Sequence, residues 1–158
     1  MFHRAVSMGA VLFAAALTAN AAAPAPAAPE RATAAEAEAM VHKAVAFYKA
    51  KGREKALGEF NDRKGLFVDR DLYITAYDME GTNIAQPMNP KMVGKNLIDI
   101  KDTEGKAYVR ERLTLAQSKG SFWQDYSFVD PLTRKVLPKQ MFCERVDEVV
   151  LCGGIYKH

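Results

Sequence analysis

Histidine and cysteine are scarce in this 158-residue chain, and their scarcity excludes several kinds of chemistry. The three histidines, His3, His42 and His158, are far apart in the sequence, so we do not expect a histidine-based metal or catalytic cluster. No C-x-x-C-H haem motif, G-x-S-x-G nucleophile elbow or P-loop occurs. The sequence therefore predicts no catalytic set, no metal and no cofactor.

An excess of charge of one sign is also missing. The chain has 22 Lys and Arg against 19 Asp and Glu, and the two signs are interspersed rather than grouped in blocks. A nucleic-acid-binding protein usually carries a concentrated basic stripe or patch. We therefore predict that nucleic acid is not a partner, and that these charges form an ordinary solvated surface.

Long apolar runs are absent except at the N-terminus. A basic segment, Met1–Arg4, precedes the apolar segment Ala5–Leu17, which is too short to span a bilayer comfortably. Ala19-Asn20-Ala21 has the small residues of a cleavage site. These features predict a cleaved signal peptide over residues 1–21 and a periplasmic protein. An uncleaved N-terminal anchor is the alternative.

The remainder of the chain is long enough for one hydrophobic core. Residues 22–32 alternate between Ala and Pro before Glu30, which favours an extended tether. We therefore predict a single folded domain over residues 33–158.

The two cysteines, Cys143 and Cys152, flank Asp147-Glu148 symmetrically. If these acids form a two-residue hairpin loop, Val146 faces Val149 and Cys143 faces Cys152 in a pair whose Cα atoms lie about 4.5 Å apart. This distance is compatible with a disulfide, and the oxidising environment outside the cytoplasm favours one in an exported protein. Two buried free thiols are the alternative, since Asp-Glu is a poor type I′ turn and a longer loop would shift the register.

The remaining pattern indicates an α+β domain. A capping box at Thr33–Glu36 opens an Ala-rich helix that Gly52 ends, and further helices are predicted over residues 53–60 and 103–119. Short turns between consecutive strands imply an antiparallel sheet. The five predicted strands cover residues 72–77, 84–86, 121–129, 136–146 and 149–156.

Aromatic side chains with polar tips are concentrated on these strands. Tyr73 and Tyr77 share one face of the first strand by its two-residue period. Lys139 and Met141 share a face of the fourth strand, and the third strand carries both Trp and Tyr. Such groups line small-molecule pockets, and a buried lysine would complement an anion. The alternative is that they are ordinary core residues with satisfied polar tips.

The assembled motifs resemble a single Cache domain, the extracytoplasmic PAS-like sensor module. The resemblance runs from Ala34 to Lys157 and includes DLYITAYDMEGTNIAQP, VGKNL, SFWQDYSFV, the PK of the fourth strand and a terminal GGIYK. It implies a five-stranded antiparallel sheet in the order 2-1-5-4-3, with a long N-terminal helix and further helices covering one face. It also implies a ligand pocket formed by Tyr73, Tyr77, Gln86, Pro87, Trp123, Tyr126, Lys139 and Met141.

Two departures from the family pattern shape the functional expectation. Gln86 stands where the pattern often has His before Pro87, which removes a titratable donor. Cache modules usually sit between two membrane helices of a receptor, whereas this sequence resembles the free-standing, exported version. We therefore expect a membrane receptor or transporter as partner, and pairing of two copies through the N-terminal helix.

Three hypotheses about function follow. The first is a periplasmic, non-enzymatic binding and sensing domain for a small anionic metabolite of the carboxylate class. The second is a small exported hydrolase or isomerase that uses Asp78 or Asp125 in the same cavity. The third is an interaction protein whose cavity is filled by its own Tyr and Trp side chains.

Overall fold

The longest helix, α1 (Ala34–Lys51), begins at the capping box that the sequence predicts. The Thr33 hydroxyl accepts a hydrogen bond from the Glu36 amide at 3.3 Å, and the Glu36 carboxylate accepts one from the Thr33 amide at 2.7 Å. Gly52 ends the helix with φ of 80°, a conformation that costs glycine little. A second helix, α2 (Arg53–Asn61), follows immediately.

The computed structural model describes Ala27 and residues 30–157 of the chain. The predicted signal peptide over residues 1–21 and most of the predicted tether lie outside the described residues, so both stay predictions. Within the described ranges, no helix is long and apolar enough to cross a membrane.

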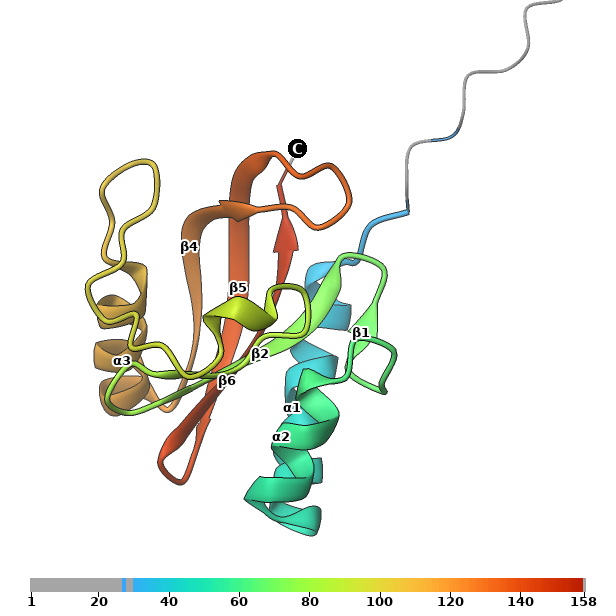
Figure 1. Cartoon of the computed structure of the whole chain (residues 1–158), viewed down its shortest axis with the longest axis vertical. Helices are drawn as coiled ribbons and strands as arrows, with labels where there is room; N and C mark the ends of the chain where they lie inside the picture. Colours follow the sequence, from blue (N-terminus) through green and yellow to red (C-terminus); the bar gives the residue numbers. More distant parts are fainter. Residues whose placement is uncertain (1–26, 28–29, 158) are drawn as a thin grey trace, which may run out of the picture.

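The strands form one antiparallel sheet in the order β1-β2-β6-β5-β4, with β3 paired beside β1 on the outer edge of β2 (Figure 1). Apart from the two-residue strand β1, which the sequence did not predict, this is the 2-1-5-4-3 order of the PAS-like fold. The predicted α+β class is confirmed. The strand bounds are β1 (Val68–Asp69), β2 (Leu72–Asp78), β3 (Asn83–Ala85), β4 (Ser121–Val129), β5 (Val136–Val146) and β6 (Val149–Tyr156).

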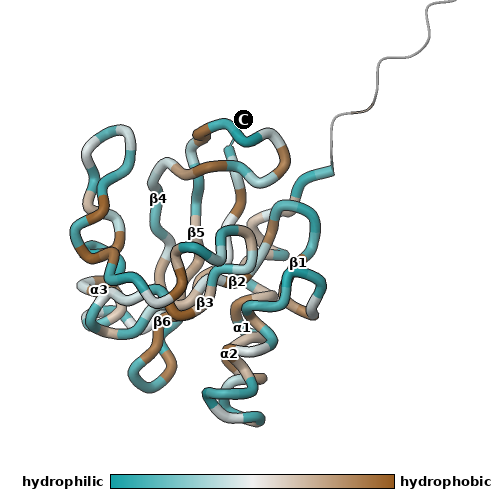
Figure 2. The backbone as a smooth tube through the Cα atoms, in the orientation of Figure 1, coloured by the Kyte–Doolittle hydropathy of each residue, from teal (hydrophilic) through white to brown (hydrophobic). Residues whose placement is uncertain are grey.

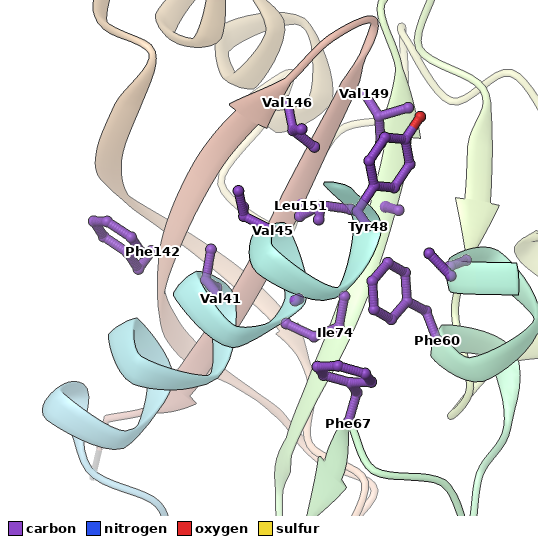
Figure 3. Close-up of a cluster of buried hydrophobic side chains, with 14 residues drawn as sticks. Val41, Val45, Tyr48, Phe60, Phe67, Ile74, Phe142, Val146, Val149 and Leu151 are labelled. Atoms are coloured by element: carbon purple, nitrogen blue, oxygen red, sulfur yellow. The ribbon is translucent and has the colours of Figure 1, made fainter. Parts of the chain in front are cut away.

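Helices α1 and α2 cover one face of this sheet. Val41 of α1 packs in the same buried cluster as Ile74 of β2 and Leu151 of β6 (Figure 3). Phe60 and Phe67 meet edge to face, with ring centroids 4.8 Å apart. Each large side chain buried in this way contributes about 1.5–3 kcal/mol. In Figure 2 hydrophobic and hydrophilic residues alternate along both helices, as expected of helices with one buried face.

Helix α3 (Tyr108–Lys119) packs in a second cluster on the opposite face of the sheet, so the helices do not all lie on one side. It also begins five residues later than the sequence predicts. Asp102 or Thr103 was the expected cap at the predicted start, but one carboxylate oxygen of Asp102 accepts hydrogen bonds from the Glu104 and Lys106 amides of its own loop. The other oxygen accepts one from the Ser127 amide on the outer edge of β4. Asp102 therefore fixes a loop against this edge strand.

The β5–β6 hairpin confirms the predicted disulfide. Val146 pairs with Val149, and Cys143 pairs with Cys152 across a Cα separation of 4.1 Å. Asp147 takes φ of 51°, which supplies the left-handed residue that a two-residue loop requires.

Arg31 ties the start of the domain to two distant turns. Its guanidinium donates two hydrogen bonds to Asp130, at 2.7 and 2.8 Å, and one to Asp71 at 3.1 Å. Both carboxylates are fully buried. Asp130 follows β4 directly, and Asp71 lies just before β2, so this ion-pair cluster links the N-terminal segment to both strands.

Candidate functional site

The tyrosines of β2 lie on the face of the sheet opposite α1. Ile74 and Ala76 pack under α1, so the alternation of the strand sends Tyr73, Thr75 and Tyr77 to the other face. All three are at most 2 % exposed. The roof over them is formed by α3 and the segment after β3, and not by the leading helices.

Lys139 is buried among these tyrosines without a carboxylate partner. It is 1 % exposed, and its ammonium donates hydrogen bonds to the hydroxyls of Tyr73 at 3.0 Å and Tyr156 at 3.2 Å. The ammonium also lies 4.2 Å and 4.5 Å from the two ring centroids. No described carboxylate forms an ion pair with it. A buried charge in such surroundings is costly unless an anion joins it.

Gly154 makes room for Lys139 beside it. A Cβ at this position would lie 2.6 Å from Met141 Cγ, 2.7 Å from the Gln140 carbonyl oxygen and 3.0 Å from Lys139 Cε. We expect Gly154→Ala to lower the free energy of unfolding by about 1–3 kcal/mol through overpacking. The matched control Gly58→Ala meets nothing within 4 Å on α2, so it should raise stability by about 0.5–1 kcal/mol. Urea unfolding of both variants measures this, and equal effects would contradict the packing argument.

A second buried cation, Arg112, lies nearby and was not identified from the sequence. It is fully buried, and its Nε donates to Gln124 Oε1 at 3.0 Å, but its Nη1 has no partner among the described residues. The guanidinium carbon stands 5.1–5.5 Å from the ring centroids of Tyr77, Tyr108 and Tyr126. An Arg at i+3 on the apolar stripe of α3, between Val109 and Leu113, is the signal that could have revealed it.

The two cations share their neighbours. Tyr126 pairs with Lys139 across the β4–β5 ladder, and its hydroxyl donates to Met141 Sδ at 2.9 Å. Arg112 Nη2 lies 3.5 Å from the same sulfur. The two positive charges therefore flank one aromatic and thioether cluster.

Burial keeps the surrounding phenols neutral. It raises the pKa of Tyr108, Tyr126 and Tyr156 above the usual value near 10. Neutral hydroxyls donate hydrogen bonds but cannot balance the two cations. The nearest carboxylate in the hydrogen-bond network is Glu111, which reaches Arg112 only through Gln124.

A cavity of about 480 Å³ opens beside this cluster. Tyr73, which accepts the Lys139 hydrogen bond, forms one wall. Gln86 forms another and presents a buried side-chain oxygen with no partner among the described residues. A smaller cavity of about 200 Å³ reaches Tyr126 and Lys139 directly. The main cavity is lined by Tyr73, Gln86, Met88, Asn89, Met92, Lys95, Leu97, Ile100, Phe128, Val129 and Pro131.

Other hollows offer less for chemistry. One of about 720 Å³, at the junction of α1 and α2, is lined mostly by exposed charged side chains. Asp78 accepts hydrogen bonds from the Glu80 and Thr82 amides and so stabilises the turn between β2 and β3. Asp125 is exposed and pairs with Lys157 at the rim of the smaller cavity. Among the described residues no group of acids, His and Cys is arranged to hold a metal.

The structure brings together most of the residues that the resemblance implies. Tyr73 and Gln86 line the main cavity, and Tyr126 and Lys139 line the smaller one. Tyr77 and Met141 lie against the guanidinium of Arg112. Pro87 is buried directly after Gln86.

Trp123 is not placed with the others. It lies 5.3 Å from Phe142, between ring centroids, and packs with the α1 side of the sheet. It is three residues from Tyr126 on the same strand, so the two side chains face opposite ways.

The sheet order and the two helical layers define a PAS-like domain, and the buried cationic and aromatic cluster lies on one face of its sheet. The family model for Single Cache domain 2 matches residues 30–156, and the chain belongs to that family. The predicted resemblance is thus confirmed.

Individual relatives agree with this assignment. The sensor histidine kinase MctS of Rhizobium johnstonii is 29% identical over 89 residues, a match covering 55% of this chain and 19% of the kinase. A methyl-accepting chemotaxis protein from Vibrio parahaemolyticus is similar in structure, with a TM-score of 0.67, 26% identity, and coverage of 77% of this chain and 86% of that one. A Cache chemosensory domain described for carboxylic acid recognition shares the fold, with a TM-score of 0.63, 23% identity, and coverage of 78% and 88%.

Proposed function

We propose that this protein is a periplasmic, non-enzymatic sensing domain that binds a small anionic metabolite of the carboxylate class and acts through a partner protein. The observation that carries the proposal is the pair of buried cations. Lys139 and Arg112 are at most 1 % exposed, and neither forms an ion pair with a described carboxylate. Neither cation lines the main cavity, whose wall is shared with the cluster through Tyr73, and a carboxylate that reached the cluster would supply the missing negative charge.

The surrounding donors suit the same ligand. The Arg112 Nη1 group has no described acceptor, and the hydroxyls of Tyr73 and Tyr126 lie beside the Lys139 ammonium and Met141. Carboxylate oxygens accept such charge-assisted hydrogen bonds strongly. No buried carboxylate faces the main cavity to act as a general acid or base, which favours binding without chemical conversion over the hydrolase or isomerase alternative.

One wall of the main cavity supports the proposed action through a partner. Val129 and Pro131 line the cavity on either side of Asp130, and Asp130 is bonded to Arg31 at the start of the domain. A ligand that shifts this wall would therefore move the N-terminal segment, which a receptor or transporter can read. Pairing of two copies through the outer side of α1 stays a prediction.

Calorimetry with propionate and pyruvate, against propionamide as an uncharged analogue, tests the proposal. We expect the carboxylates to bind and the amide not to bind. Arg112→Gln should weaken carboxylate binding about 30-fold, since a charged hydrogen bond is lost. The matched control Arg110→Gln changes an exposed arginine on the same helix and should leave affinity unchanged. Carboxylate binding that Arg112→Gln does not alter, in a variant that melts cooperatively, would reject this site.

A further inference from the structure

Exposed aliphatic side chains gather on two segments that lie next to each other. Val129 and Val136 form a cross-strand pair at the end of the β4–β5 hairpin, and both are 48 % exposed. Together with Ile100 they line a small hollow of about 170 Å³. Leu132, in the turn of the same hairpin, is 42 % exposed.

Basic side chains surround these aliphatic groups. Lys95 and Lys101 lie on the segment that carries Ile100, and Arg134 and Lys135 lie in the hairpin turn. None of these four forms an ion pair with a described residue. We call the combined surface the apolar–basic face; it consists of Ile100, Val129, Leu132 and Val136 with Lys95, Lys101, Arg134 and Lys135.

Two acids of the same two segments are paired with arginines. Asp99 is bonded to Arg110, and Asp130 is bonded to Arg31. Asp102 also lines the small hollow, and its carboxylate accepts three backbone amide hydrogen bonds but forms no ion pair among the described residues. The apolar–basic face therefore presents four unpaired cations around one carboxylate and keeps a positive excess. Two such faces would repel each other, which argues against a second copy of this chain as the occupant.

The apolar–basic face lies at the end of the molecule where the described domain begins and ends. The Arg31–Asp130 pair holds the hairpin beside the start of the domain, and the Lys157 amide donates to the Pro138 carbonyl at 2.8 Å. Figure 1 shows this turn and both ends of the described domain at one end of the molecule. Under the alternative in which residues 1–21 stay as an uncleaved anchor, this end of the domain would also follow a membrane segment by only a short tether.

We propose that the apolar–basic face docks on an anionic lipid surface. Its aliphatic groups enter the headgroup boundary, while lysine and arginine stems lie along the acyl carbons and place their charges at the phosphates. Each basic side chain at such a surface contributes about a fivefold gain in affinity, which salt weakens. The sensing domain is thereby held at the membrane where a receptor or transporter resides.

Vesicle co-sedimentation tests the proposal with the protein recovered from the cells that export it. Binding to vesicles of phosphatidylglycerol and phosphatidylcholine should exceed binding to phosphatidylcholine alone, and should fall as salt rises. The double variant Lys101→Gln/Lys135→Gln should bind the anionic vesicles about 25-fold more weakly. Leu132→Ser should bind about tenfold more weakly.

Matched controls change the same chemistry elsewhere. Lys51→Gln/Lys55→Gln removes two exposed lysines at the opposite end of the molecule, and Leu66→Ser removes a leucine that is 61 % exposed. Both should bind as the wild type does. Equal weakening by the controls, or equal binding to neutral vesicles, would overturn the proposal. So would tight binding to poly-glutamate without vesicle binding, which would indicate an acidic protein, or self-association through Leu132 in sedimentation velocity.

Discussion

Lys139→Met is expected to abolish carboxylate binding while leaving the protein as stable as before or more stable. The wild-type ammonium has two hydroxyls and two ring faces around it but no described counter-ion. Methionine fills a similar volume without a charge, so the free energy of unfolding should stay unchanged or rise by up to about 2 kcal/mol. The affinity for propionate should fall at least about 100-fold, because the principal partner of the anion is gone.

The opposite signs of these two effects make the experiment decisive. If Lys139 had only a structural role, its substitution would lower the stability of the protein. If it binds the ligand, its substitution lowers the affinity for propionate without lowering stability. Lys157→Met is the matched control, since Lys157 is exposed and paired with Asp125. Thermal melts with and without propionate measure both quantities. A Lys139→Met protein that is strongly destabilised, or that binds propionate normally, would contradict the proposed site.

Arg31→Met is expected to lower the free energy of unfolding by about 2–4 kcal/mol. The change leaves the carboxylates of Asp71 and Asp130 buried without their cation, and breaking a buried pair by removing one partner is strongly destabilising. The matched control is Arg110→Met. That arginine pairs with Asp99 in an exposed position, where an ion pair contributes at most about 1 kcal/mol. Denaturant unfolding measures both, and equal losses would show that burial of the Arg31 cluster is unimportant.

The same ion pair sets a pH dependence. Burial alone would raise the pKa of Asp130, but hydrogen bonds from Arg31, Thr133 and the Leu132 amide outweigh it and hold the pKa below its usual range. A depressed carboxyl pKa contributes stability that is fully present above the unfolded value near 4, and that is lost as pH falls through the folded value. The stability gap between wild type and Arg31→Met should therefore be constant at neutral pH and narrow below about pH 4.

Local sequence rules predicted the features that depend on near neighbours. The capping box at Thr33, the stop at Gly52 and the β5–β6 hairpin with its Cys143–Cys152 bridge all follow from spacings of a few residues. The predicted start of α3 was wrong, because Asp102 accepts hydrogen bonds from amides of its own loop and of β4 instead of capping a helix. The order of the strands was supplied by the family resemblance, since periodicity does not specify which strands pair.

The chain's own pattern determined which side chains share a strand face, and so grouped Tyr73 with Tyr77 and Lys139 with Met141. It did not determine what covers each face. The packing of α3 against the tyrosine side placed Arg112 in the cluster. The two-residue period of β4 already separates Trp123 from Tyr126, and the packing of α1 decided that Trp123 lies away from the cluster. The burial of a charge depends on elements far away in sequence, because only tertiary contacts remove water from around it. The burial of Lys139 and Arg112 without a described counter-ion was therefore decided by the folded structure.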